Sequence, residues 1–173
     1  MTIRQLAIAT LTLLAVAAAP LAAVARAPQA ASDNAATSET ERANAAVVES
    51  LYRAFATGDG PGIAAVLGDN IVWTEAESGP YADHNPYVGP GAVFEGVFGR
   101  IGQQWQGFAA TPATVLPSGD RVVVLGRYTG TNIATGEPLD AQFAHIFTVS
   151  GGKIVAFQQY TDTARWVGAT TPD

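Results

Sequence analysis

Ala141-Gln142-Phe143-Ala144-His145-Ile146-Phe147-Thr148-Val149 is the most regular stretch of this chain. Its residues alternate strictly. One face would hold alanine, phenylalanine, histidine, phenylalanine and valine, and the other would hold glutamine, alanine, isoleucine and threonine. Such alternation predicts a β-strand with one buried face. The face with His145 is the more apolar one, so we expect this histidine to point into the protein.

Further strands are predicted on both sides of this one. Turn sequences rich in glycine, serine and proline separate three long strands, at residues 121–131, 139–149 and 154–161. Another strand is predicted at 105–115, where Pro112 is typical of a sheet edge or a β-bulge. A short strand is predicted at 71–75. The later strands follow one another through short turns, which indicates an antiparallel meander.

Three helices are predicted before the meander. The first follows Ser38 and Glu41, whose spacing fits a capping box, and it runs to Thr57 with apolar residues at helical spacing. The second begins at Pro61 and the third at Pro90. Helices followed by antiparallel strands predict an α+β fold, in which the helices pack on one face of a curved sheet.

The N-terminal segment has the pattern of a secretory signal peptide. Arg4 precedes an uncharged stretch rich in alanine and leucine, and Ala23-Val24-Ala25 supplies small residues before a cleavage point. We therefore expect residues 1–25 to be a signal peptide and the mature protein to be exported, to the periplasm or outside the cell. The alternative is an uncleaved anchor, but the apolar run before Pro20 is shorter than the ~20 residues that cross a bilayer. Residues 26–39 lack apolar periodicity and are expected to form a flexible linker.

The composition argues against several classes of function. Cysteine is absent, so disulfides and thiolate chemistry are excluded. The 15 acidic residues outnumber the 9 basic ones, and lysine and arginine do not cluster, which argues against nucleic acid and anionic membranes as partners. The chain has two histidines and lacks the spacing of an HExxH motif, so we expect no metal site. We expect no cofactor either.

Two residues near the end of the chain are candidates for proton transfer. Asp162 follows the apolar run 154–157 and a polar segment that includes Tyr160. A carboxylate there either reaches water at the strand end or lies in a cavity, where burial would raise its pKa. If the strands of His145 and Asp162 are neighbours, the carboxylate would orient the imidazole, which would then move the proton. The alternative for His145 is a buried histidine bonded to a neighbour.

Other polar residues could also face a cavity. Trp73 and Glu75 share one face of the strand at 71–75. Glu75 is either a solvated charge or a second acid of the cavity, where repulsion between it and Asp162 would push their pKa values apart. Tyr128 points away from the side of Arg127, and it either packs or donates a hydrogen bond to a carbonyl oxygen.

Several motifs in order resemble a known family. They are residues 51–59, 69–73, 86–90, 152–154 and 160–162. Their order and spacing resemble the SnoaL-like branch of the nuclear transport factor 2-like superfamily, which also contains ketosteroid isomerases and scytalone dehydratase. The resemblance covers residues 42–166, within a domain placed at 40–168, and residues 169–173 are left as a tail. It implies a cone-shaped, cystatin-like α+β barrel with an antiparallel sheet packed against three N-terminal helices around an apolar pocket.

The resemblance also implies a kind of chemistry. Family members carry out cofactor-free acid–base reactions such as isomerisation, cyclisation or dehydration, and others only bind ligands or form assembly interfaces. Asp162 matches the acid or base of the SnoaL-type cyclases. The catalytic tyrosine and aspartate of ketosteroid isomerases match Leu51 and Thr74 instead, each one residue from Tyr52 and Glu75. Since a slip of one residue reverses the facing side of a strand, that specific activity is not implied.

We therefore expect a pocket for a small apolar or polyketide-like molecule, with Asp162 and His145 as the catalytic pair. Tyr128 or Gln159 would stabilise a developing oxyanion. The alternative is a non-catalytic ligand-binding or dimerisation module, and a homodimer is implied by the resemblance alone. The residues expected to contact the ligand are Trp73, Glu75, Tyr81, Phe94, Phe98, Tyr128, Phe143, Gln159 and Tyr160.

Overall fold

The computed structural model describes residues 27–172, and side chains from Ser38 to Pro172. The chain divides into two compact units, residues 1–34 and 35–173, and the second unit contains the sheet. The predicted signal peptide at 1–25 lies outside the described residues. Within the described part of the chain, no helix is both long and apolar enough to cross a membrane.

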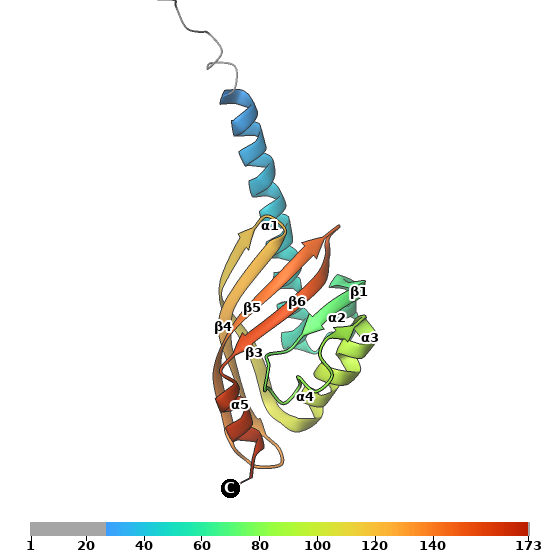
Figure 1. Cartoon of the computed structure of the whole chain (residues 1–173), viewed down its shortest axis with the longest axis vertical. Helices are drawn as coiled ribbons and strands as arrows, with labels where there is room; N and C mark the ends of the chain where they lie inside the picture. Colours follow the sequence, from blue (N-terminus) through green and yellow to red (C-terminus); the bar gives the residue numbers. More distant parts are fainter. Residues whose placement is uncertain (1–26, 173) are drawn as a thin grey trace, which may run out of the picture. The chain divides into compact units, whose positions relative to one another are not determined.

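A curved six-stranded sheet forms the second unit together with its helices (Figure 1). The strands are β1 (Leu67–Thr74), β2 (Tyr87–Val88), β3 (Trp105–Ser118), β4 (Arg121–Asn132), β5 (Pro138–Ser150) and β6 (Lys153–Thr161). Their order is β2-β1-β6-β5-β4-β3. This confirms the predicted α+β fold with a curved sheet.

The sheet is antiparallel except for one pair of strands, and the sequence did not predict this parallel pair. β1 pairs with β6 in parallel, while all other neighbours are antiparallel. The parallel pair arises because the chain leaves β1, forms helices and the meander, and returns beside β1 in the same direction. Pro112 lies in the edge strand β3 at a shift of register, as expected for a residue without a backbone N–H.

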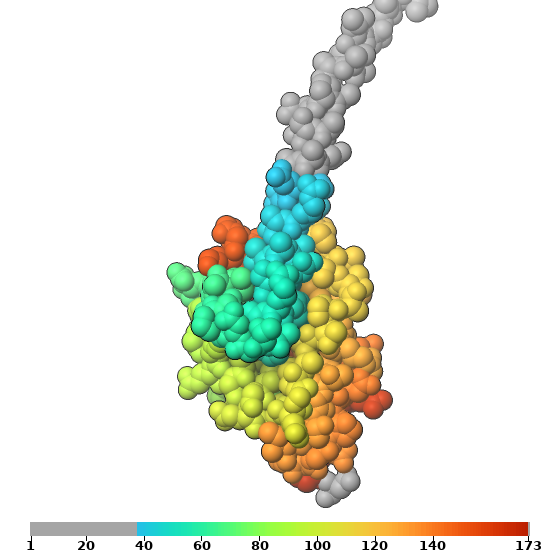
Figure 2. Space-filling model, turned by 180° about the vertical axis from the view of Figure 1, so that it is seen from behind, coloured from blue at the N-terminus to red at the C-terminus, as the bar shows by residue number. Residues whose placement is uncertain are grey.

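The first two helices contribute buried residues to the hydrophobic core, and Figure 2 shows their side of the molecule. These residues are Val48, Leu51, Tyr52, Ala54 and Ile63. The two helices are α1 (Ala27–Thr57) and α2 (Gly60–Val66), and Asp59 caps α2 by accepting a hydrogen bond from the backbone N–H of Gly62. Helix α1 begins at Ala27, where the sequence predicted a linker, so Ser38 is inside the helix and does not cap it. Alanine-rich sequence favours helix through its backbone propensity, even without the apolar stripe used for the prediction.

The third predicted helix is present but is not uniform. It consists of α3 (Pro90–Val93), a π-helical turn η2 (Phe94–Phe98) and α4 (Gly99–Gln104). Val93, Val97 and Ile101 are buried, as their spacing predicts. The π-helical turn is notable because such turns occur often at functional sites.

A last helix, α5 (Thr163–Thr170), was not predicted. Asp162 caps it by accepting a hydrogen bond from the backbone N–H of Arg165. Trp166 in this helix is only 2% exposed and packs against Trp105 and Tyr128. The segment beyond β6 is therefore part of the core, and not only a tail.

Candidate functional site

A small cavity of about 50 Å³ lies between the sheet and the helices. Its wall is mostly apolar and aromatic, made of Leu51, Phe55, Trp73, Val97, Phe98, Ile101, Phe108, Ala110, Phe147, Phe157 and Trp166. Its polar groups are Tyr52, Glu75, Tyr128, His145 and Gln159. Five polar side chains in an aromatic wall are the usual composition of a small-molecule site.

The polar side chains form one hydrogen-bonded chain centred on His145. The Tyr52 hydroxyl lies 2.7 Å from Nδ1 of His145, and the Tyr128 hydroxyl lies 2.5 Å from Nε2. Gln159 donates from Nε2 to the Tyr128 hydroxyl over 2.8 Å, and its Oε1 accepts from the backbone N–H of Ala76 over 3.1 Å. Because a backbone N–H can only donate, this last contact fixes the orientation of the Gln159 amide.

The number of protons in this series of hydrogen bonds leaves one tyrosine O–H without an acceptor in the series. A neutral imidazole has one N–H, so His145 donates to one tyrosine oxygen and accepts a proton from the other tyrosine. In one tautomer Tyr128 donates to His145 and the proton of Tyr52 is free. In the other tautomer Tyr52 donates to His145 and the proton of Tyr128 is free. In either case one phenolic O–H is available to a ligand in the cavity.

Burial keeps these three groups uncharged. It lowers the pKa of His145 to about 3 and raises the pKa of Tyr52 above its usual value. Burial also raises the pKa of Tyr128 well above 10, and the negative charge of Glu75 raises it further. At neutral pH the site therefore offers neutral hydrogen-bond donors and a neutral imidazole.

Glu75 is the acid of the cavity. It is 3% exposed, and burial raises its pKa to about 7, although the Trp73 and Gln159 side chains favour the ionised form. Trp73 Nε1 donates to Glu75 Oε1 over 2.6 Å. Asn85 clamps the backbone of Glu75 from both sides, accepting from its N–H at 2.9 Å and donating to its C=O at 2.8 Å.

The structure brings together six of the residues singled out from the sequence. His145, Trp73, Glu75, Phe98, Tyr128 and Gln159 all line the cavity. Alternation placed His145 on the inner side of its strand and Trp73 and Glu75 on one shared face. His145 is 4% exposed on β5, and Trp73 and Glu75 point to the same buried side.

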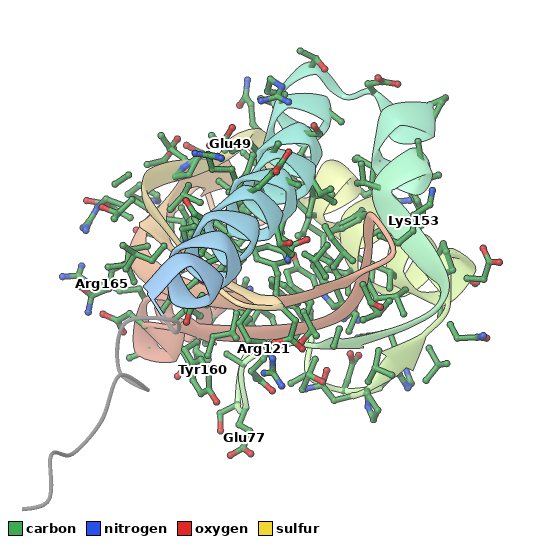
Figure 3. The ribbon with its side chains drawn as sticks, turned by 90° about the horizontal axis from the view of Figure 1, so that it is seen from above. Glu49, Glu77, Arg121, Lys153, Tyr160 and Arg165 are labelled. Carbon is green, nitrogen blue, oxygen red and sulfur yellow. The ribbon has the colours of Figure 1, made fainter. Side chains whose placement is uncertain are left out.

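Four other residues expected at the ligand lie elsewhere. Tyr81 is buried behind the cavity, where its hydroxyl donates to Gln104 and accepts from Trp105. Phe143 does not line the cavity, but it stacks on His145 with ring centres 3.9 Å apart and so supports the imidazole. Phe94 packs on Phe98 outside the cavity. Tyr160 is 56% exposed and points outward (Figure 3).

Asp162 is the main correction. The expected Asp162–His145 pair does not form, because the register pairs His145 with Gln159 and the strand ends at Thr161. Asp162 lies beyond the end of the strand and takes the N-cap position of α5, so strand alternation does not direct its side chain. The Asp162 carboxylate caps α5 and borders a groove on the outer face of the sheet, away from the cavity.

Tyr52 was not selected as a site residue from the sequence. It was assigned to the buried stripe of the first helix, and a stripe of apolar spacing does not distinguish packing residues from a hydroxyl that lines a cavity. The signal that could have found it is its polar tip within an otherwise apolar stripe, since a buried tyrosine O–H needs a partner.

The described residues also bear on metal binding. Among residues 27–172, no group of three or more histidine, aspartate or glutamate side chains is arranged to hold a metal ion. The polar groups of the cavity are one carboxylate, one imidazole, two phenols and an amide. This set suits hydrogen bonding and proton transfer.

Comparison with known proteins assigns the family. The sequence matches the model of the SnoaL-like domain over residues 48–157, so the chain belongs to the SnoaL-like domain family. An NTF2-like protein from Burkholderia thailandensis E264 is 32% identical, with a TM-score of 0.71 over 75% of this chain and 98% of that one. An NTF2-like protein of unknown function from Burkholderia pseudomallei K96243 is 27% identical, with a TM-score of 0.68 over 75% and 98%.

One further structure carries a ligand. TerC, co-crystallised with polyporic acid, is 23% identical to this chain, with a TM-score of 0.66 over 73% of this chain and 97% of TerC. At this identity the likeness concerns the fold. A search of curated protein sequences finds no match to the chain.

Proposed function

We propose that the cavity binds a neutral, largely apolar molecule with a carbonyl oxygen, and that Glu75 transfers a proton on it without a cofactor. The observation that carries this proposal is a buried carboxyl group whose pKa of about 7 lies near neutral pH, in a small, mostly apolar cavity with uncharged donors. At neutral pH both forms of Glu75 are populated, as an acid–base catalyst requires.

The charge of the wall supports a neutral ligand. Among the described residues that line the cavity there is no lysine or arginine, so an anionic group would enter without a countercharge. One free phenolic O–H, from Tyr52 or Tyr128, can donate to a carbonyl oxygen. The co-crystal of TerC with polyporic acid supports a small organic ligand for this fold.

The proton transfer follows from these groups. The carboxylate of Glu75 takes a proton from a carbon next to the carbonyl, and the electron pair of the broken C–H bond moves to the oxygen. The free tyrosine O–H stabilises the enolate oxygen, in a cavity with a mostly apolar wall where such a hydrogen bond is stronger than in water. Glu75 then returns the proton to another carbon, or the enolate carbon attacks a second carbonyl carbon of the same molecule and the alkoxide formed takes the proton from Glu75.

The exchange of α-protons tests this step. 2-Butanone is incubated with the protein in D₂O, and the loss of its α-proton signals is followed by NMR. We expect the wild type to accelerate exchange, and Glu75→Gln to lose ~10²–10⁴-fold of that rate. Asp162→Asn is the matched control, a carboxylate outside the cavity, and should exchange as the wild type does. Equal rates in wild type and Glu75→Gln would refute the role of Glu75.

A second candidate is binding without catalysis. The cavity of about 50 Å³ is small next to the ~150 Å³ of an engineered cavity that holds benzene. Outside the cavity, Leu125 and Tyr160 are 42% and 56% exposed on the outer face of the sheet, which suits an interface between two copies. Ketone binding without faster exchange, together with a dimer in light scattering, would favour this candidate.

We also propose that the protein is exported, on the pattern of residues 1–25.

A further inference from the structure

A second hollow borders the cavity on the outside. It is a surface groove of about 530 Å³ formed where the end of α1, the start of α2, the third helical segment and β3 meet. Phe55, Phe98, Ile101 and Phe108 belong to the wall of both the groove and the cavity. These four side chains are therefore the partition between the cavity and the groove.

The three phenylalanines of this partition are only half-buried. Phe55 packs edge-on against Phe98 and Phe108, with ring centres 5.4 and 6.1 Å apart. The contacts across this part of the wall are between rings. Rotation of these side chains would join the cavity to the groove.

The backbone beside two of these rings is irregular. Phe98 is the last residue of the π-helical turn and is followed by Gly99. Phe108 follows Gly107, whose φ of +62° is in the left-handed region, and it lies where the register of β3 against β4 shifts. Both rings therefore stand at positions where regular backbone structure is interrupted.

The groove is apolar throughout. Its described lining consists of apolar and aromatic side chains and five glycines, without a charged residue. The glycines keep it open. A Cβ atom at Gly102, for example, would meet nothing within 4 Å. An apolar groove next to a very small cavity that holds five polar side chains fits a molecule that has a polar head and an apolar tail.

We propose that the groove is a binding subsite for the apolar tail of an elongated ligand, whose carbonyl head occupies the cavity. The tail passes between Phe55, Phe98 and Phe108, which act as the gate. This inference rests on the proposed function for the head group. It adds the shape of the ligand, namely a small head and an apolar chain or ring system that extends outward.

The three tryptophans of the chain report on the two spaces separately. Trp73 and Trp166 line the cavity, whereas Trp105 lines the groove. In ¹⁵N-labelled protein their indole N–H signals can be followed during titration with 2-butanone and with 2-nonanone. We expect 2-butanone to shift the signals of Trp73 and Trp166 alone. 2-Nonanone should also shift Trp105 and bind at least ~10-fold more tightly, because each buried methylene adds to affinity.

A blocking variant tests the groove itself. Gly102→Phe places a ring over it, at an exposed helical position with free space. The matched control is Gly91→Phe, an exposed glycine with equal space in the same helical segment but outside the groove. We expect Gly102→Phe to bind 2-butanone as the wild type does and to lose the ~10-fold preference for 2-nonanone. Gly91→Phe should keep that preference.

Each result decides a different claim. If 2-nonanone binds Gly102→Phe as tightly as wild type, or leaves Trp105 unshifted in the wild type, the tail subsite is wrong while the cavity site stands. If neither ketone shifts Trp73 or Trp166, the proposed function fails and the tail subsite fails with it. Gly102→Ala, which adds only a methyl group, verifies that changes at this position leave the fold intact.

Discussion

Glu75 is a carboxyl group that folding takes out of water, and its protonation should be visible in stability. Its pKa is about 7 in the folded protein and 4.5 ordinarily, so between these pH values the folded state holds a proton that the unfolded state has lost. Stability therefore falls as pH rises through this range, by about 3 kcal/mol in total. Below pH 4.5 both states are protonated and Glu75 causes no loss.

Urea unfolding of the wild type and of Glu75→Gln between pH 4.5 and 8 measures this effect. His145 contributes with the opposite sign, because burial lowers its pKa to about 3 and the unfolded state gains a proton first as pH falls. His145 is present in both proteins, so the difference in unfolding free energy between wild type and Glu75→Gln reports on Glu75 alone. A difference that does not change with pH would contradict the buried, protonated state of Glu75.

Tyr128 and Tyr52 should differ in their cost to stability. Tyr52→Phe leaves one nitrogen of His145 without a partner, which costs about 1–3 kcal/mol. Tyr128→Phe leaves Nε2 of His145 and Nε2 of Gln159 without a partner, so it should cost about twice as much. Urea denaturation of both variants at one pH compares them. A larger loss for Tyr52→Phe would contradict the assigned chain of hydrogen bonds.

Alternation predicted much of the site at the level of single residues. It placed His145 on the buried face of its strand and put Trp73 and Glu75 on one shared face, because side chains alternate along a strand. It left open whether Glu75 is solvated and which way Tyr128 faces. It did not place Asp162, since the end of β6 and the start of α5 could not be read from a polar sequence. The pKa of Glu75 depends on burial by helices far along the chain, which no local pattern reports.

At the level of elements, the third helical segment depends on Gly96. A Cβ atom there would lie 2.1 Å from Cε1 of Tyr87, whose hydroxyl bonds to Tyr81 and Asp83. Gly96→Ala should therefore destabilise the protein by about 1–3 kcal/mol through overpacking. Gly91→Ala in the same segment meets open space and should gain up to about 1 kcal/mol from helix propensity. Thermal unfolding of Gly96→Ala and Gly91→Ala measures both changes. Similar changes in stability for the two variants would contradict the close approach of Tyr87 to Gly96.

Asp162 belongs to helix α5 and should behave as a cap. Asp162→Ala removes the side chain that accepts from Arg165 N–H and should cost about 1 kcal/mol, whereas Asp162→Asn should cost little. Chemical denaturation measures both. Neither change should alter ketone exchange. A loss of exchange in Asp162→Asn would restore the catalytic role first predicted for this residue.

Helices were predicted well where caps and apolar stripes coincide. Pro90 opens the third helical segment, as the sequence indicated, and α2 begins one residue before the predicted Pro61, with Asp59 as its cap. Two helical parts were not predicted, for a physical reason. The start of α1 relies on alanine propensity and lacks an apolar stripe, and α5 is too short to show one clearly, although its Trp166 enters the core.

On the scale of the whole molecule, the fold was predictable because the order of helices and strands resembles a family. The cavity was not predictable, because its wall combines α1, η2, α4, five strands and α5, and its volume is set by how their side chains meet. The gate between cavity and groove depends on the same contacts. Sequence patterns give directions of side chains, whereas packing gives the space left between them.

The protonation of Glu75 inside this cavity is the centre of the account. ¹³C NMR of protein labelled at the glutamate side-chain carboxyl carbons measures it directly, with Glu75→Gln used to assign the signal. We predict that the Glu75 signal titrates with a midpoint near pH 7. A midpoint near the ordinary value of 4.5 would contradict the account, because it would mean that the carboxylate is solvated and ionised at neutral pH.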